Sequence, residues 1–129
     1  MSDCAAVLDA SAVLAVLRSE PGEEVVRPLV GRAAWSAVNL CEVASKLAER
    51  GMPAPAVEEA VDALSLVVYD FDSEMGLAAA DLRRLGPRGL SLGDRACLVL
   101  ARRLGVPAVT ADREWTRLSI DGVAVTVIR

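Results

Sequence analysis

The chain has 129 residues, of which 53% are hydrophobic and 25% charged, and its formal net charge is −4. This composition is that of a globular protein with one domain over residues 1–129, and it excludes a disordered chain. The absence of histidine excludes catalysis by Ser-His-Asp triads, Cys-His pairs and histidine-based ribonuclease sites, and it excludes most zinc sites. Carboxylates are therefore the side chains left for any chemistry.

The sequence favours a cytoplasmic protein without membrane association. No apolar run approaches the roughly 20 residues needed to cross a bilayer. The first residues, MSDCAAVLDAS, include an acid but no basic segment of the kind that begins a signal peptide. The cysteines, Cys4, Cys41 and Cys97, are odd in number and widely spaced. They predict small buried side chains in a reducing compartment, not disulfides or a metal site.

Strand and helix patterns alternate along the chain. The predicted strands are 4–8, 33–35, 66–69, 107–110 and 123–128. The predicted helices are 11–17, 23–30, 36–51, 53–64, 72–85, 92–104 and 112–118, with a loop at 86–89. This alternation predicts an α/β fold with a central, mostly parallel sheet that helices cover on both faces. Sites in such sheets lie beyond the carboxyl ends of the strands.

Two acids, Asp9 and Asp112, each follow a predicted strand and precede a predicted helix. An aspartate at such a junction commonly caps the helix, and capping is the simpler interpretation of each residue. The alternative is a carboxylate that projects from the carboxyl end of a strand and holds a hard cation.

Two further acids lie on predicted helices. Glu42 comes one turn after Asn39, so both can face one cleft, but the spacing also fits an exposed face with a Glu42–Lys46 ion pair. Asp94 ends the segment LSLGD, which has the form of a capping box. Asp94 also begins an apolar helix face with Cys97, and a buried carboxylate must be paired or coordinated.

The shared placement of the four acids favours a common role. In a parallel sheet these positions can converge on one crevice, where like charges raise one another's pKa unless divalent cations neutralise them. Ligation by oxygen alone suits Mg²⁺ or Mn²⁺. Two such ions about 4 Å apart can activate water and stabilise the leaving oxygen in phosphodiester cleavage.

The motifs resemble those of PIN-domain ribonucleases and, more narrowly, of the VapC toxins of toxin–antitoxin pairs. They are Asp9 after an apolar strand, Asn39-x-x-Glu42, Leu90-Ser91-Leu92-Gly93-Asp94 and Thr110-Ala111-Asp112-x-x-Trp115. The resemblance covers essentially the whole chain. It implies a three-layer α/β/α PIN-like fold, Mg²⁺- or Mn²⁺-dependent endoribonuclease activity on RNA, homodimerisation, and inhibition by a cognate antitoxin protein.

The same resemblance implies a role for each motif residue. The catalytic, metal-binding residues would be Asp9, Glu42, Asp94 and Asp112. The polar partners of these acids or of the waters around the metal would be Ser11, Asn39, Ser91 and Thr110. The negative net charge departs from the basic surface that phosphate contacts favour. The alternative from another class is a catalytically silent PIN-like module that only binds a partner protein.

Overall fold

The computed structural model describes residues 4–86 and 88–129. Within these residues, the strands of one five-stranded sheet are β1 (Ala6–Leu8), β2 (Ala33–Ser36), β3 (Val67–Tyr69), β4 (Ala108–Thr110) and β5 (Val125–Val127). Their order is β3-β2-β1-β4-β5, and every neighbouring pair is parallel. The predicted α/β class is confirmed, and the sheet is parallel throughout.

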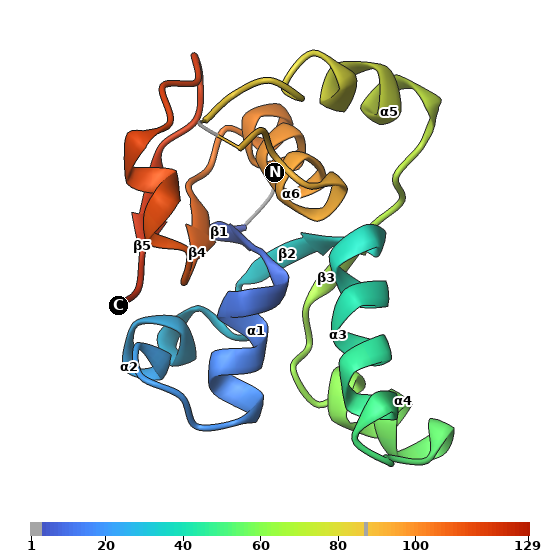
Figure 1. Ribbon diagram of the computed structural model, residues 1–129. Helices are drawn as coiled ribbons and strands as arrows, with labels where there is room; N and C mark the ends of the chain where they lie inside the picture. Colours follow the sequence, from blue (N-terminus) through green and yellow to red (C-terminus); the bar gives the residue numbers. More distant parts are fainter. Residues whose placement is uncertain (1–3, 87) are drawn as a thin grey trace.

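Helices cover both faces of this sheet. In the described part of the chain they are α1 (Ala10–Leu17), α2 (Glu23–Val26), α3 (Ala37–Glu49), α4 (Ala54–Asp62), α5 (Ser73–Ala80) and α6 (Leu92–Leu104). Two 3₁₀ segments are η1 (Arg27–Leu29) and η2 (Arg113–Arg117). Helices α1 to α4 pack on one face, and α5 and α6 pack on the other (Figure 1). The three-layer arrangement is thereby confirmed.

Three predicted helices differ from those observed. The segment predicted as helix 23–30 is split into α2 and η1, at a point where Pro28 supplies no backbone N–H for an α-helical bond. Helix α5 ends at Ala80 instead of residue 85 and is followed by turns. The segment after Asp112 is the 3₁₀ segment η2. Pro87, in the predicted loop 86–89, lies outside the described residues. The first three residues of the segment MSDCAAVLDAS lie outside them too.

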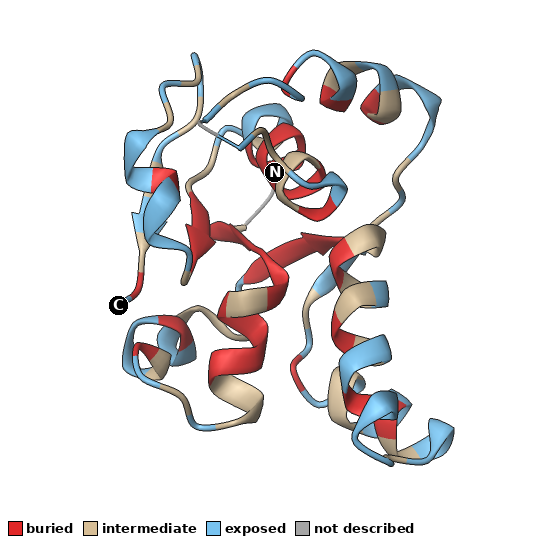
Figure 2. Cartoon of the chain, in the orientation of Figure 1, coloured by how far each residue is buried: buried red, intermediate tan, exposed pale blue. Residues whose placement is uncertain are grey.

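The core forms two clusters, one on each side of the sheet. Successive side chains of β1 point to opposite faces of the sheet, so Ala6 and Leu8 lie on the side of α1 and Val7 lies on the side of α6. Trp35 is buried in the first cluster and Trp115 in the second. Figure 2 shows that the inner strands β1, β2 and β4 are buried.

The prediction of three buried cysteines is correct only for Cys97. Cys4 is half-buried, and Cys41 is exposed. Cys41 follows Leu40 on α3, where the apolar positions that face the core are Val43 and Leu47. The helix therefore turns Cys41 outward, and the prediction for this residue was wrong.

The connections of the sheet reverse direction between β1 and β4. The chain leaves β1 towards β2 and β3 and then returns to place β4 on the other side of β1. In parallel sheets a crevice opens at such a switch point, outside the carboxyl ends of the two strands. Asp9 and Ala111 are the residues that directly follow β1 and β4. Among the described residues, no helix is both long and apolar enough to span a membrane.

Candidate functional site

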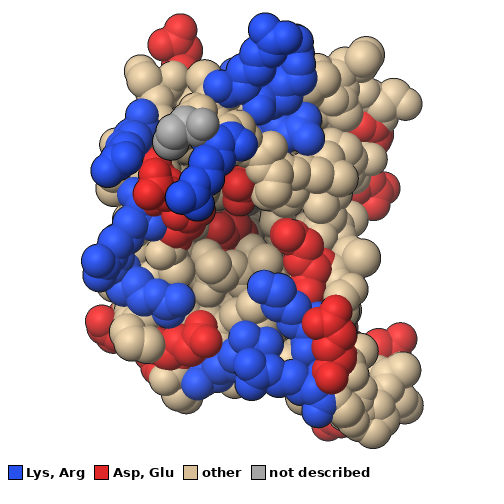
Figure 3. Space-filling model, viewed as in Figure 1, with Lys and Arg blue, Asp and Glu red and all other residues tan. Residues whose placement is uncertain are grey.

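A cavity of about 150 Å³ lies at the carboxyl edge of the sheet, and eight described residues line it. The lining residues are Asp9, Ala10, Ser11, Asn39, Glu42, Lys46, Asp94 and Asp112. Each of the four acids comes from a different part of the fold: the end of β1, helix α3, the start of α6 and the end of β4. Figure 3 shows acidic side chains in a recess of this face, with lysine and arginine side chains along its rim.

Asp9 is buried, with 5% of its surface exposed, and both of its oxygens accept hydrogen bonds. Oδ1 accepts from the Ser11 hydroxyl at 2.7 Å and from the Ala12 amide at 2.9 Å, which caps α1. Oδ2 accepts from the Thr110 hydroxyl at 2.5 Å, which ties β1 to β4. Burial raises the pKa of Asp9 from 3.8 to about 6, these hydrogen bonds oppose the rise, and the charge of Asp94 adds to it.

The hydroxyl groups of Ser11 and Thr110 are held from behind by the backbone. The Ala111 amide donates to Ser11 Oγ at 2.8 Å, and the Asp112 amide donates to Thr110 Oγ1 at 3.0 Å. Because each hydroxyl oxygen accepts from an amide, its own hydrogen is directed to Asp9. Both predicted polar partners of Asp9 therefore contact this carboxylate.

Asp94 is part of a capping box at the start of α6. Its amide donates to Ser91 Oγ at 3.1 Å, and the Ser91 amide donates to Asp94 Oδ2 at 3.2 Å. Burial raises the pKa of Asp94, the hydrogen bonds from Ser91 oppose this, and the charge of Asp112 raises it further. The capping interpretation is thus correct, and the same side chain also lines the cavity.

Glu42 faces α6, and Asn39 holds it there. Asn39 is buried, and its Nδ2 donates to Glu42 Oε1 at 2.8 Å and to the Gly93 carbonyl at 3.1 Å. A Cβ atom at Gly93 would lie 2.6 Å from Glu42 Oε2. Glycine at this position therefore leaves the room that the carboxylate occupies. The ion pairs seen among the described residues do not include Glu42 with Lys46, although Lys46 lines the cavity.

Asp112 is exposed and caps η2, where Oδ1 accepts from the Glu114 amide at 2.9 Å. Its charge reaches Asp94, whose pKa it raises. The acids also affect the buried thiol of Cys97. Burial raises the pKa of this thiol well above its ordinary value, and the charges of Asp9, Asp94 and Glu42 raise it further. The four acids thus produce one region of negative potential.

Two residues of this site were not predicted to belong to it. Gly93 belongs to a recognised segment, but the spacing within one helix does not reveal that α3 approaches it. Lys46 was considered only as a possible ion-pair partner of Glu42 on an exposed face. A glycine in the first turn of a helix, directly before an acid, is the signal that could have indicated a close approach.

The site's donor set fits a hard divalent cation. Within residues 4–86 and 88–129, no group of three or more acidic or cysteine side chains is already arranged to hold a metal ion. The acids around the cavity nevertheless offer only oxygen, which Mg²⁺ and Mn²⁺ prefer. Buried Asn39 also keeps an Oδ1 atom without a hydrogen-bond partner among the described residues. Burial is the main cause of the raised pKa values of Asp9 and Asp94, and a cation would offset both the cost of burying these charges and the repulsion between neighbouring acids.

Several solved structures of similar fold contain a toxin–antitoxin pair. VapBC2 from Rickettsia felis bound to a promoter DNA fragment has a TM-score of 0.71 and 14% identity, and the match covers 95% of this chain and 97% of that one. DNA-bound VapBC from Salmonella typhimurium has a TM-score of 0.69 and 19% identity, with coverage of 98% and 99%. FitAB bound to the IR36 DNA fragment has a TM-score of 0.72 and 19% identity, with coverage of 95% and 94%. At these identities the likeness shows the fold.

Comparison with curated protein sequences gives no match. The sequence pattern of the PIN domain, in contrast, matches residues 6–121. This stretch begins at β1, includes all four acids that line the cavity, and ends beyond η2. The chain therefore belongs to the PIN-domain family.

Proposed function

We propose that the protein is a metal-dependent endoribonuclease that acts as the toxin of a toxin–antitoxin pair. The observation that supports this most is the cavity at the switch point between β1 and β4, which four carboxylates from separate elements line. PIN domains are generally metal-dependent nucleases, which agrees with this chemistry.

In this proposal Asp9, Glu42, Asp94 and Asp112 hold Mg²⁺ or Mn²⁺. Such a cation polarises a phosphate and lowers the pKa of water when it is bound. The other polar residues keep the carboxylates in place. Ser11 and Thr110 orient Asp9 through its two oxygens, Ser91 orients Asp94, and Asn39 orients Glu42.

The proposed partners follow from the structural neighbours. Those three structures are of VapBC or FitAB complexes, and all three contain DNA. We propose that this chain, as a single domain over residues 1–129, forms a homodimer in the cytoplasm and binds a cognate antitoxin that blocks its cleft.

The test is RNA cleavage by the purified protein without any partner. We expect cleavage with Mn²⁺ or Mg²⁺, and we expect its loss in excess EDTA and in the variants Asp94→Asn and Asp9→Ala, because each removes a carboxylate from the cavity. Circular dichroism checks that both variants fold. Asp72→Asn is the matched control, since Asp72 caps α5 and does not line the cavity. Full activity in EDTA or in either variant would rule out the proposed mechanism.

The alternative is a PIN-like module without catalysis that only binds a partner protein. One observation favours it: in the described residues the acids are not already arranged around a metal position. Isothermal titration with Mg²⁺ and Mn²⁺ separates the two functions. Binding that Asp94→Asn abolishes supports the nuclease, and a lack of binding by the unaltered protein supports the silent module.

A further inference from the structure

A second cavity, of about 230 Å³, adjoins the first and shares Asp94 and Asp112 with it. Its wall is mixed in character. Leu90 and Leu118 supply apolar surface, while Glu114 and Arg88 supply opposite charges. The proposed cleavage chemistry uses Asp94 and Asp112 but none of these four residues.

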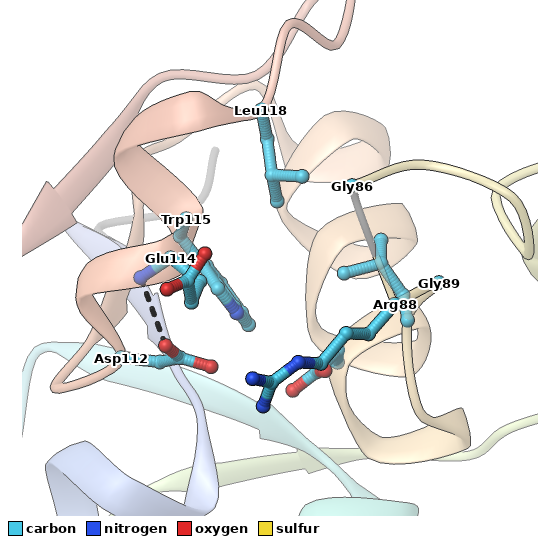
Figure 4. Close-up of a pocket in the computed structure, with 9 residues that line it drawn as sticks. Gly86, Arg88, Gly89, Asp112, Glu114, Trp115 and Leu118 are labelled. Carbon is cyan, nitrogen blue, oxygen red and sulfur yellow. Dashed lines mark hydrogen bonds between the residues drawn. The ribbon is translucent and has the colours of Figure 1, made fainter.

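Trp115 gives this second cavity an unused hydrogen-bond donor. The indole is buried, with 1% of its surface exposed, and its Nε1 has no partner among the described residues. Figure 4 shows the nitrogen end of the indole pointing into the cavity, between Asp112 and Arg88. A buried N–H without an acceptor is unfavourable, so the cavity is suited to a ligand that brings an acceptor.

The remaining groups narrow the chemistry of that ligand. Glu114 lines the same cavity as Trp115, and its carboxylate can accept from an N–H group. The Arg88 side chain extends towards Asp112 and offers a planar cation (Figure 4). The complementary molecule is flat, has apolar faces, and carries a donor and an acceptor on its edge. A nucleobase has all of these features, whereas a lysine or arginine side chain brings no acceptor for the indole.

We propose that this cavity binds one unstacked nucleobase of the RNA, next to the phosphate on which the four acids act. The inference rests on the proposed ribonuclease function and gives it a specificity-determining site. Proteins read single-stranded RNA by stacking splayed bases on aromatic or arginine planes and by bonding their edges. Trp115 and Glu114 bond the edge of the base, and Arg88 stacks on its face.

The first test measures kcat/KM on RNA oligonucleotides that differ only in the nucleotides flanking the cleaved bond. Trp115→Phe keeps an aromatic side chain but removes the indole N–H together with the pyrrole ring, so preference between nucleotides should fall about fivefold, the factor typical of one neutral hydrogen bond. Glu114→Gln should alter the ranking without affecting folding, since its side chain is 60% exposed. Trp35→Phe is the matched control, because Trp35 is also buried with an unpartnered Nε1 but lies in the other core cluster.

The second test does not depend on cleavage. The chain has two tryptophans, so Trp35→Phe leaves Trp115 as the only one. Nucleoside monophosphates added with Mg²⁺ should change the fluorescence of Trp115, and they should do so more weakly when Glu114→Gln is added. An unchanged nucleotide ranking in both cavity variants, together with unresponsive Trp115 fluorescence, would overturn the inference and leave the nuclease proposal intact. Absence of cleavage by the unaltered protein would instead overturn the nuclease proposal, and the fluorescence titration would still decide on the cavity.

Discussion

Asp9 holds its negative charge in a place that disfavours it. Its pKa of about 6, against 3.8 for an ordinary aspartate, means that the folded chain binds the proton more tightly than the unfolded chain. The ionised carboxylate therefore destabilises the fold above this pKa. As the pH falls through 6 towards 3.8, the group becomes protonated first in the folded state and the fold gains stability.

As the pH rises from about 4 to about 8 in EDTA, we expect the free energy of unfolding of the parent to fall by ~2–3 kcal/mol relative to that of Asp9→Asn, because a shift of about two pKa units corresponds to this energy. The amide has one acceptor oxygen where the carboxylate has two, so the variant should be the less stable protein at about pH 4, where both side chains are neutral. Denaturant unfolding over a pH series measures this change in the stability difference. Asp72→Asn controls for replacing a capping carboxylate by an amide. A stability difference between parent and variant that stays constant from about pH 4 to about pH 8 would contradict this account.

Gly93 governs how close Glu42 can come to the start of α6. Its backbone lies beside the Glu42 carboxylate, and its carbonyl accepts a hydrogen bond from Asn39, which also bonds Glu42. A methyl group at Gly93 would push the flexible end of Glu42 aside and leave the helix backbone in place. The position therefore allows the site and the fold to be perturbed separately.

We expect Gly93→Ala to weaken Mg²⁺ binding and RNA cleavage by about 10- to 100-fold, the range found when a group that orients a metal ligand is lost. The free energy of unfolding should stay equal or rise by up to ~1 kcal/mol, because alanine is the better helix former. Calorimetry measures Mg²⁺ binding, and thermal unfolding measures the change in stability. Gly76→Ala is the control, since its Cβ would meet only Phe71 Cε2 at 3.9 Å. Equal activity of both variants would show that Gly93 does not set the Glu42 position.

At the scale of elements, three of the four acids take part in capping the N-terminus of a helix. Asp9 caps α1, Asp112 caps η2, and Asp94 completes the box at the start of α6. Each helical segment therefore begins at the edge of the cavity, with its first backbone N–H groups satisfied by the acids or by Ser91. The favourable interaction of a carboxylate with a helix N-terminus partly offsets the repulsion among these charges.

Removing the α6 cap should affect both the fold and the site. We expect Ser91→Ala to lower the free energy of unfolding by ~1 kcal/mol and also to reduce cleavage, because Asp94 loses the partner that orients it. Asp72→Ala at the start of α5 removes a comparable cap and should cost similar stability without affecting cleavage. Ser91→Thr should restore both properties. Thermal unfolding and cleavage rates, measured on all three variants, check this expectation.

Most elements were predictable because their signals are local. Apolar runs of three to five residues followed by Asp or Ser marked β1, β2 and β4 with their following helices, and Gly105 marked the end of α6. The errors at 23–30 and 72–85 arose where apolar periodicity continued beyond the end of the helix. In those places proline and the packing of the chain decided where the helix ends, and periodicity carries no information on either.

At the scale of the molecule, the distribution of charge matters more than its sum. The net charge is −4, yet on the face of the cavity lysine and arginine side chains surround the recessed acids (Figure 3). A polyanion can contact the rim while cations neutralise the recess. The negative net charge is therefore compatible with RNA as a substrate.

We expect RNA binding by Asp94→Asn, measured by fluorescence anisotropy with Mg²⁺, to weaken as the salt concentration rises. Adding Lys46→Ala, which removes a cation that lines the acidic cavity, should reduce the slope of log K against log salt by about 0.7, the value for one phosphate contact with a single strand. Arg32→Ala is the control, because Arg32 precedes β2 and lies at the opposite edge of the sheet. If Lys46→Ala and Arg32→Ala reduce the slope equally, the rim of the recess is not the RNA path.

The approach of the acids to one another could be inferred from the sequence only in outline. Asp9, Asp94 and Asp112 stood beside a predicted strand end or helix start, which limited their position to one edge of a parallel sheet, whereas Glu42 lay within a predicted helix. The role of Gly93, the lysine at the cavity, and the second cavity behind Asp112 depend on which helices meet. Contacts between α3 and α6 join residues more than 50 positions apart, such as Asn39 and Gly93, and no periodicity encodes them.

The hydrogen bonds that connect Asp9, through Ser11 and Thr110, to two backbone amides provide a way to follow the site in solution. The amides of Ala111 and Asp112 are bonded to hydroxyl groups whose hydrogens point at Asp9. Deuterium uptake at these two amides should therefore be slower when the hydroxyl groups of Ser11 and Thr110 are hydrogen-bonded to the Asp9 carboxylate. It should be faster when these hydrogen bonds are broken and the hydroxyl groups can rotate. Two backbone positions thus report on the state of the Asp9 carboxylate without substrate, label or turnover.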